Sequence, residues 1–247
     1  MGGGQNNGRV VGSAAEPRIA VVSGGSRGLG LEIVRKLADR GMHVVLTSRR
    51  VADGQAAIGL LGDAADCVAV RDLDITDAAS VAQFAGWLRG RLGRCDVLVN
   101  NAAVLIDDDR DASSVDLAVV RRTLETNLLG TWRLTQAIAP LMRAAGYGRI
   151  VNISSGLGSL AAMRCDLPGY RVSKTAVNAM TRMLADELAV DGVLVNACCP
   201  GLTRIEVPAT RDGTRLFATA DTAVWLATLP DDGPTGGFYR DHVLIEW

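Results

Sequence analysis

Tyr170 and Lys174 are four residues apart at the start of a segment with helical periodicity, so their side chains share one helix face. Tyrosine, with an ordinary pKa near ~10, is a poor acid or base at neutral pH. A cation one turn away and the positive end of the helix both favour the phenolate. Ser155, at the end of the preceding expected strand, can hydrogen-bond a substrate oxygen. The three residue types suit proton transfer at a carbonyl or alcohol oxygen, although a partly buried Tyr beside a solvated Lys would give the same spacing.

A second candidate site lies in residues 18–30, which read RIAVVSGGSRGLG. An apolar run of strand length is followed by a glycine turn, and apolar residues then recur at helical spacing from Leu31. Glycines allow the backbone to approach a phosphate, and the first N–H groups of the helix point at it. The spacing of Gly24, Gly28 and Gly30 is G-x-x-x-G-x-G and not the dinucleotide G-x-G-x-x-G. The segment predicts a phosphate site, with a ligand-free βα turn as the alternative.

Strands and helices alternate along the chain, and the strands are solidly apolar, as is typical when helices cover both faces of a parallel sheet. The expected strands are 19–22, 43–47, 66–73, 96–99, 149–153, 193–199 and 238–244, and the expected helices follow at 31–40, 52–61, 77–92, 114–145, 168–189 and 220–229. The pattern predicts an α/β fold with a single doubly wound parallel sheet. Ligands of such sheets bind at the carboxyl ends of the strands. Pro140 is expected to kink the long helix.

The composition excludes several classes of protein. The chain has 247 residues, 48% of them hydrophobic, and a formal net charge of -1, so neither nucleic acid nor a membrane is expected as a partner. Residues 1–16 are polar and glycine-rich and predict a flexible tail before one domain at 17–247. Five cysteines without a C-x-x-C motif, and two histidines, predict no metal site. A signal peptide is not evident, which favours a cytoplasmic protein.

Several segments, taken together and in order, resemble the short-chain dehydrogenase/reductase family from about residue 17 to the C-terminus. They are SGGSRGLG, LDIT, VLVNNAA, LETNLLG, GRIVNISS, GYRVSK and CCPG. Within the family, the sequence is most similar to carbonyl-reductase-like members. The resemblance implies a Rossmann-type domain that carries both the cofactor site and the substrate site.

The resemblance also implies catalytic roles. Tyr170 would be the general acid/base, Lys174 would lower its pKa and bind the nicotinamide ribose, and Ser155 would polarise the carbonyl. Asn127, in LETNLLG, would hold a water in a proton relay. Ser154 remains an alternative to Ser155, because a shift of one residue at the strand end exchanges the two.

The implied cofactor contacts begin at the glycine turn, which would hold the pyrophosphate. Asp74 and Ile75 would contact the adenine, and Asn101 would lie along a ribose. Pro200 and Gly201 would flank the nicotinamide. The complete set of expected cofactor-binding residues is Gly24, Ser26, Arg27, Gly28, Leu29, Gly30, Arg49, Asp74, Ile75, Asn101, Tyr170, Lys174, Pro200 and Gly201.

The choice between NADP(H) and NAD(H) can be argued physically. NAD use normally requires an acid at the end of the second strand, to bind the ribose 2′-hydroxyl. That end reads TSRR here, with no acid before Asp53. Arg49, together with Arg27 of the glycine turn, can bind a 2′-phosphate through charge-assisted contacts. We therefore expect NADP(H), with solvated surface arginines as the alternative.

The leading hypothesis is an NADPH-dependent oxidoreductase that reduces a ketone or aldehyde, or catalyses the reverse reaction. One departure from the family pattern is Ile205, where a threonine that binds the nicotinamide carboxamide is usual; Thr203 could substitute. This departure keeps two alternatives open, a non-redox cyclase or isomerase and an NADP(H)-binding regulator. Ser155 and Tyr170 are only fifteen residues apart, without a long insertion, so a homodimer or homotetramer is expected.

Overall fold

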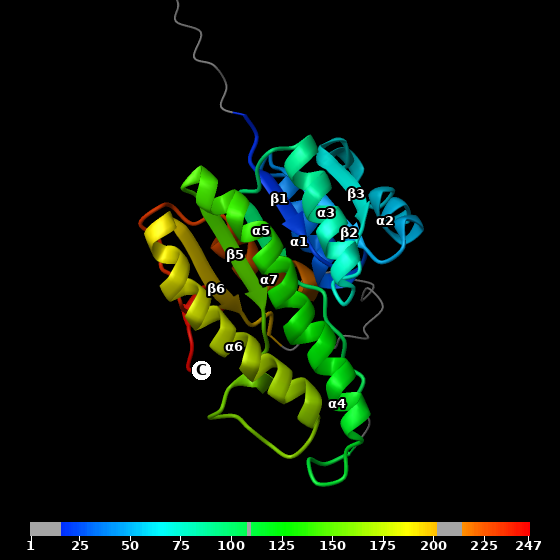
Figure 1. The fold of residues 1–247 in the computed structure, drawn as a ribbon, viewed down its shortest axis with the longest axis vertical. Coiled ribbons are helices and arrows are strands. Elements are labelled where there is room, and N and C mark those ends of the chain that lie inside the picture. Colours follow the sequence, from blue (N-terminus) through cyan, green and yellow to red (C-terminus); the bar gives the residue numbers. More distant parts are fainter. Residues whose placement is uncertain (1–15, 108–109, 202–213) are drawn as a thin grey trace, which may run out of the picture.

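The computed structural model describes residues 16–107, 110–201 and 214–247 (Figure 1). Most of the expected flexible tail lies outside the described residues, as do Thr203 and Ile205. The side chains of residues 214–219 are likewise outside the description.

A single sheet of eight strands runs through the described residues, in the order β3-β2-β1-β4-β5-β6-β7-β8. The first seven strands pair in parallel, which confirms the doubly wound parallel sheet. The crossover between β1 and β4 lies at the centre, where doubly wound sheets bind their ligands. The strands are β1 (Ile19–Val22), β2 (His43–Ser48), β3 (Val68–Asp72), β4 (Val97–Asn100), β5 (Gly148–Ile153), β6 (Val193–Cys198), β7 (Phe238–Arg240) and β8 (Val243–Leu244).

The end of the chain departs from the sequence prediction. The expected strand 238–244 is two strands, because Asp241 and His242 adopt φ values of 51° and 63° and turn the chain back. As a result β8 pairs with β7 in the antiparallel direction. A smaller departure is a 3₁₀ helix at Gly62–Cys67, which shortens the expected strand 66–73 to β3.

Helices cover both faces of the sheet. One buried cluster packs the strands against α1, α2 and α7, and the other packs them against α3, α5 and α6. The green and yellow helices α5 and α6 are seen over β5 and β6 in Figure 1. The helices are α1 (Gly28–Ala38), α2 (Val51–Ile58), α3 (Ala78–Arg91), α4 (Leu117–Leu124), α5 (Thr131–Ala145), α6 (Pro168–Leu188) and α7 (Thr214–Ala227).

The expected long helix 114–145 is interrupted. A π-helical turn at Glu125–Gly130 separates α4 from α5. Contacts from other segments accompany this wider turn: the Asn127 amide bonds both backbone groups of Val104, and Gly130 lies against Ile75. Such turns are rare and often lie at functional sites. Pro140 is accommodated within α5, which continues to Ala145.

Candidate active site

Ser155, Tyr170 and Lys174 meet at the carboxyl end of β5. Ser155 follows this strand, and α6 carries the other two side chains on one face. The Ser155 hydroxyl faces the Tyr170 phenol, close enough to lower the pKa of that phenol by hydrogen bonding. The Lys174 Nζ donates to the Ile153 carbonyl at 2.7 Å and lies 5.6 Å from the centre of the Tyr170 ring. Tyr170 is 6% exposed and Lys174 is 3% exposed, whereas Ser155 is partly exposed, so two of the three groups are nearly shielded from water.

The structure distinguishes the two serines at this strand end. The Ser154 Oγ points into the protein, where it donates to Asn178 Oδ1 at 2.6 Å. The Ser155 hydroxyl faces Tyr170 and also accepts the Leu157 N–H at 3.2 Å. Only Ser155 therefore lies where it can meet a substrate oxygen together with Tyr170.

Burial controls the ionisation of the cluster. It raises the pKa of Tyr170 to about 12; the hydrogen bond with Ser155 opposes the rise, and the nearby Cys199 adds to it. This direction is opposite to the lowering expected from the spacing of Tyr170 and Lys174, because desolvation of the phenolate outweighs the favourable contacts. Burial also lowers the pKa of Lys174 to about 8.

Asn127 connects the π-helical turn to α6. Its Nδ2 donates to Ser173 Oγ at 3.0 Å, and the Ser173 hydroxyl donates to the Tyr170 carbonyl at 2.7 Å. Because the Asn127 amide also bonds Val104, it links the segment after β4 with α6. The side chain therefore has a clear positioning contribution.

The glycine turn after β1 is tightly built. Gly24 and Gly28 have φ values of 63° and 53°, which favour glycine. A Cβ on Gly30 would lie 2.3 Å from the Gly24 carbonyl oxygen and 2.5 Å from Asn101 Nδ2, so the turn has no room for a side chain there. The Asn101 Nδ2 donates to the carbonyls of Ser23 and Gly24 at 2.9 and 3.0 Å. In this structure Asn101 holds the turn in place.

The N-terminus of α1 lacks a capping side chain of its own. Its N-cap residue, Arg27, makes no side-chain capping bond, and its first turn contains no acid. Ser26 and Leu29 beside it are partly exposed, and Arg27 is exposed. Backbone N–H groups at such a terminus, with a helix dipole behind them, are suited to an anion.

Two arginines at the end of β2 have different surroundings. Arg50 forms an ion pair with Asp53, at 2.9 Å from Nε to Oδ2. Arg49 is exposed and has no ion pair with any residue that the structure describes, although its charge helps to lower the pKa of Asp74. The larger cause of that lowering is the hydrogen bond from the Thr76 hydroxyl. Arg49 therefore remains available to a ligand anion.

The remaining expected cofactor residues occupy the same edge of the sheet. Ile75 is buried, and its carbonyl accepts a hydrogen bond from Arg133 Nη1 at 2.6 Å. Pro200 and Gly201 follow β6 and are partly exposed; Gly201 has a φ of 81°.

Three side chains near the catalytic cluster had no part in the sequence prediction. The Cys199 Sγ accepts the Gly156 N–H at 3.1 Å and the Arg240 Nε–H at 3.3 Å. Arg171 is buried next to Tyr170, and its guanidinium binds Asp166 and the carbonyls of Leu157 and Ala162. It thereby ties down the loop between β5 and α6. The sequence indicated Arg171 only as a charged residue at a helix position that faces the protein interior.

Asp107 is the third of these side chains, and it bonds the first turn of α6. Its carboxylate accepts the Tyr170 backbone N–H at 2.9 Å. The residue is only 7% exposed, although the sequence places it in an acidic loop.

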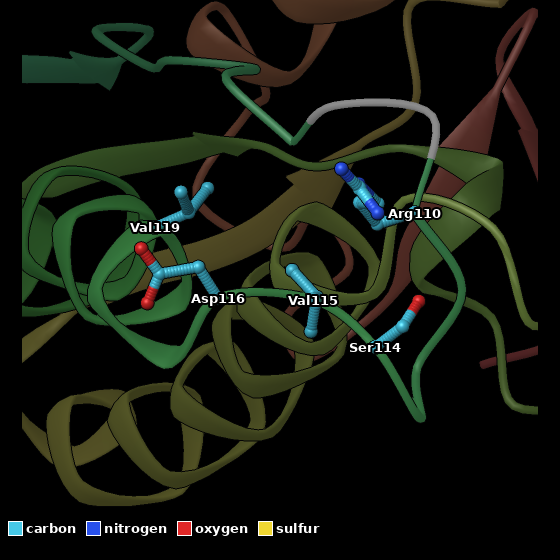
Figure 2. A pocket seen from close by; sticks show the side chains of 5 residues that line it. All are labelled: Arg110, Ser114, Val115, Asp116 and Val119. Atoms are coloured by element: carbon cyan, nitrogen blue, oxygen red, sulfur yellow. The ribbon is translucent and has the colours of Figure 1, made fainter.

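A hollow of about 280 Å³ lies beside this loop and the start of α4. Figure 2 shows its lining side chains, which come from the segment before α4 and from that helix itself. None of the expected catalytic residues lines the hollow, so it is separate from the cluster of Ser155, Tyr170 and Lys174. Its lining residues are Arg110, Ser114, Val115, Asp116 and Val119.

Within residues 16–107, 110–201 and 214–247, no three His, Cys, Asp or Glu side chains are grouped as metal ligands. Over the same part of the chain, no helix has the length and apolar character needed to cross a membrane.

Comparison with known proteins places this arrangement among enzymes. Carbonyl reductase 1 (NADPH) of Sus scrofa is 32% identical, with 95% of this chain and 96% of the relative covered. Carbonyl reductase 3 (NADPH) of Homo sapiens is 33% identical, with 93% and 98% covered. The first alignment spans 280 positions, more than the 247 residues of this chain, so that relative has inserted residues that this chain lacks.

Solved structures give the same result. A metagenomic short-chain oxidoreductase in complex with NADP is 33% identical, with a TM-score of 0.76, and 88% of this chain and 93% of that chain are covered. Salutaridine reductase from Papaver somniferum has a TM-score of 0.77 at 27% identity, with 90% and 99% covered. The family model for short chain dehydrogenases matches residues 18–214. This chain therefore belongs to the short-chain dehydrogenase/reductase family.

Proposed function

We propose that this protein is an NADPH-dependent oxidoreductase that reduces a ketone or aldehyde to an alcohol, or catalyses the reverse reaction. The observation that carries the proposal is the meeting of Ser155 and Tyr170 at the carboxyl end of β5, with Lys174 buried beside them. The names of the relatives, carbonyl reductases that use NADPH, support both the carbonyl substrate and the cofactor.

The residues at the carboxyl ends of β1 and β2 fit NADPH. The uncapped N-terminus of α1 and the close-packed glycine turn would receive the pyrophosphate, while Arg27 and Arg49 would bind the 2′-phosphate. Asp74 and Ile75 would contact the adenine, and Pro200 and Gly201 would flank the nicotinamide. When bound, the cofactor supplies the hydride.

The protein's own residues would then move the proton. The Ser155 hydroxyl would hydrogen-bond the substrate oxygen and orient it toward Tyr170. With its pKa raised to about 12, Tyr170 stays protonated at neutral pH and is ready to donate to the oxygen as the alcohol forms. The Lys174 ammonium would stabilise the phenolate that remains, and Asn127 would hold a water that returns the proton.

The test is NADPH consumption over a panel of ketones and aldehydes, followed by absorbance, with Tyr170→Phe as the control. The proposal expects consumption with at least one carbonyl and its loss in the variant. Consumption that persists in Tyr170→Phe would contradict the role of Tyr170. If NADPH binds without consumption by any carbonyl, the non-redox enzyme or the NADP(H)-binding regulator replaces the reductase.

We also propose a homodimer or homotetramer formed through α4, α5 and α6. Large apolar side chains are exposed on and beside these helices, including Leu117, Leu129, Val172 and Met183. Ser155 and Tyr170 are close in sequence, so no long insertion covers this surface. Light scattering at micromolar concentration tests the proposal, and a monomer would refute it.

A cytoplasmic location is proposed on the state of the cysteines. All five are free thiols, and Cys95, Cys198 and Cys199 are buried. Unpaired thiols are typical of a reducing compartment. Fractionation of cells that express the protein would test this, and recovery outside the cytoplasm would contradict it.

A further inference from the structure

The catalytic helix α6 begins without a local cap. Its N-cap residue is Leu167, which offers no side-chain acceptor and adopts the left-handed conformation, with φ 50° and ψ 48°. The first helical residue, Pro168, has no N–H, but the next residues present N–H groups that need partners. Tyr170 is the third residue of the helix, so any fraying of this turn displaces the proposed acid.

Asp107 supplies the missing acceptor from a distant part of the chain. Its Oδ2 accepts the Tyr170 N–H at 2.9 Å across 63 residues of sequence. Its Oδ1 accepts the hydroxyl of Thr123, which is fully buried on α4, at 3.2 Å. One carboxylate therefore joins the segment after β4, α4 and the first turn of α6.

Gly169 permits this approach. A Cβ at that position would lie 3.0 and 3.2 Å from the two carboxylate oxygens of Asp107, and 3.2 Å from the Cα of Val120. The helix start, α4 and the carboxylate are thus packed closely around a position without a side chain. The charge also suits the place, because a carboxylate at a helix N-terminus is favoured by the dipole.

We propose that Asp107 is a positioning residue for the proposed reaction: by capping α6 it holds the Tyr170 backbone, and through it the phenol, against Ser155. The proposal rests on the acid role of Tyr170. Asp107 acts through the helix and does not touch the substrate. It should therefore affect turnover more than NADPH binding, because the proposed phosphate contacts lie at α1 and at the end of β2.

The test uses Asp107→Ala and Asp107→Asn, with Asp77→Ala as a matched control. Asp77 caps α3 in the same way, by accepting the Ala79 N–H at 2.9 Å, but far from the cluster. We expect Asp107→Ala to lower kcat by about tenfold or more, with a change of less than about threefold in the KM for NADPH. The amide oxygen of Asn can still accept the Tyr170 N–H, so Asp107→Asn should stay within about threefold of the wild type.

Amide hydrogen exchange of the peptide that covers 167–174 gives a readout that is independent of activity. Asp107→Ala should exchange faster there, and Asp107→Asn and Asp77→Ala should match the wild type. A wild-type kcat and wild-type exchange in Asp107→Ala would overturn the proposal, as would an equal loss of kcat in Asp107→Asn. If Asp107→Ala does not fold, Thr123→Val removes one anchor, and unchanged exchange at 167–174 would again overturn it.

A failure of the proposed function has a different signature. If the wild type consumes no NADPH with any carbonyl, the comparison of kcat values can no longer be made. Amide hydrogen exchange still decides whether Asp107 caps the helix, because it measures the first turn of α6 directly.

Discussion

The N-termini of α1 and α6 face the same edge of the sheet but are completed in opposite ways. At α1, neither Arg27 nor any acid of the first turn caps the backbone N–H groups. At α6, Leu167 offers no cap either, but Asp107 reaches in from the segment after β4 and accepts the Tyr170 N–H. Both helices lack a local cap, and only one of them is given a carboxylate by the fold.

The difference follows from what each terminus has to do. A carboxylate at α1 would occupy the N–H groups and repel a phosphate, so this terminus serves a ligand best when it is free. The first turn of α6 carries the proposed acid, whose value depends on a fixed position. The other capped helices, α3 and α4, use Asp77 and Asp116 from their own sequence.

The largest effect is expected from Tyr170→Phe. The variant removes only the phenol oxygen at the α6 end, so carbonyl reduction should fall by about a thousandfold, in the range of general acid catalysis. Binding of NADPH, followed by the fluorescence of the cofactor, should remain close to that of the wild type. Loss of binding together with activity would show that the two ends of the site are not separable.

Arg27→Asp would give α1 the kind of terminus that α6 has. The new carboxylate can cap the helix and removes a cation, so the KM for NADPH should rise by about a hundredfold. The same cap should stabilise the fold by about 0.5–1 kcal/mol in urea unfolding.

Arg27→Asn also removes the cation and can cap the helix, but it adds no negative charge, so it separates the effect of the new carboxylate charge from the loss of the arginine. We expect its KM for NADPH to lie between those of the wild type and Arg27→Asp. An unchanged KM in Arg27→Asp would refute the anion site at α1.

Cofactor preference gives a smaller effect. Arg49→Ala should lower the ratio of kcat/KM for NADPH to that for NADH by about tenfold, the value of a charge-assisted contact. Arg50→Ala is the matched control, because Arg50 is already paired with Asp53. Equal ratios in the two variants would contradict the assignment of Arg49 to the 2′-phosphate.

The smallest effect concerns stability and pH. Burial lowers the pKa of Lys174 from 10.5 to about 8. Between these values the unfolded chain binds more protons than the folded protein, so this group makes stability rise with pH there. Below pH about 8 the protein bears the full destabilisation from burying the charged Lys174 side chain, and above pH 10.5 this destabilisation disappears.

Urea unfolding of the wild type and Lys174→Met at several pH values measures this. The wild type should gain stability relative to the variant as the pH rises from about 8 toward 10.5. The Tyr170 phenol, whose pKa is raised to about 12, is common to both proteins and cancels in the difference. A difference that does not change with pH would contradict a neutralised Lys174 in the folded protein.

Much of the fold could be predicted from local patterns. The apolar runs placed seven of the eight strands within a few residues, and the start of α6 at Pro168 was correct. The interruption of the helix 114–145 was not predictable from periodicity, because the side chains on both sides of the π-helical turn keep a helical pattern. The contacts of Asn127 with Val104 and of Gly130 with Ile75 belong to the tertiary structure.

The candidate site divides in the same manner. Residue types and spacings made Tyr170, Lys174, the glycine turn and Arg49 candidates, and the order of the family-like segments along the sequence assigned their roles. The resemblance preferred Ser155 and left Ser154 as an alternative, and the tertiary structure supplied the different partners of the two serines, Asn178 for Ser154 and Tyr170 for Ser155. The tertiary structure also reversed the expected direction of the Tyr170 pKa and brought Asp107 to α6, because desolvation and long-range contacts depend on which segments the fold packs together.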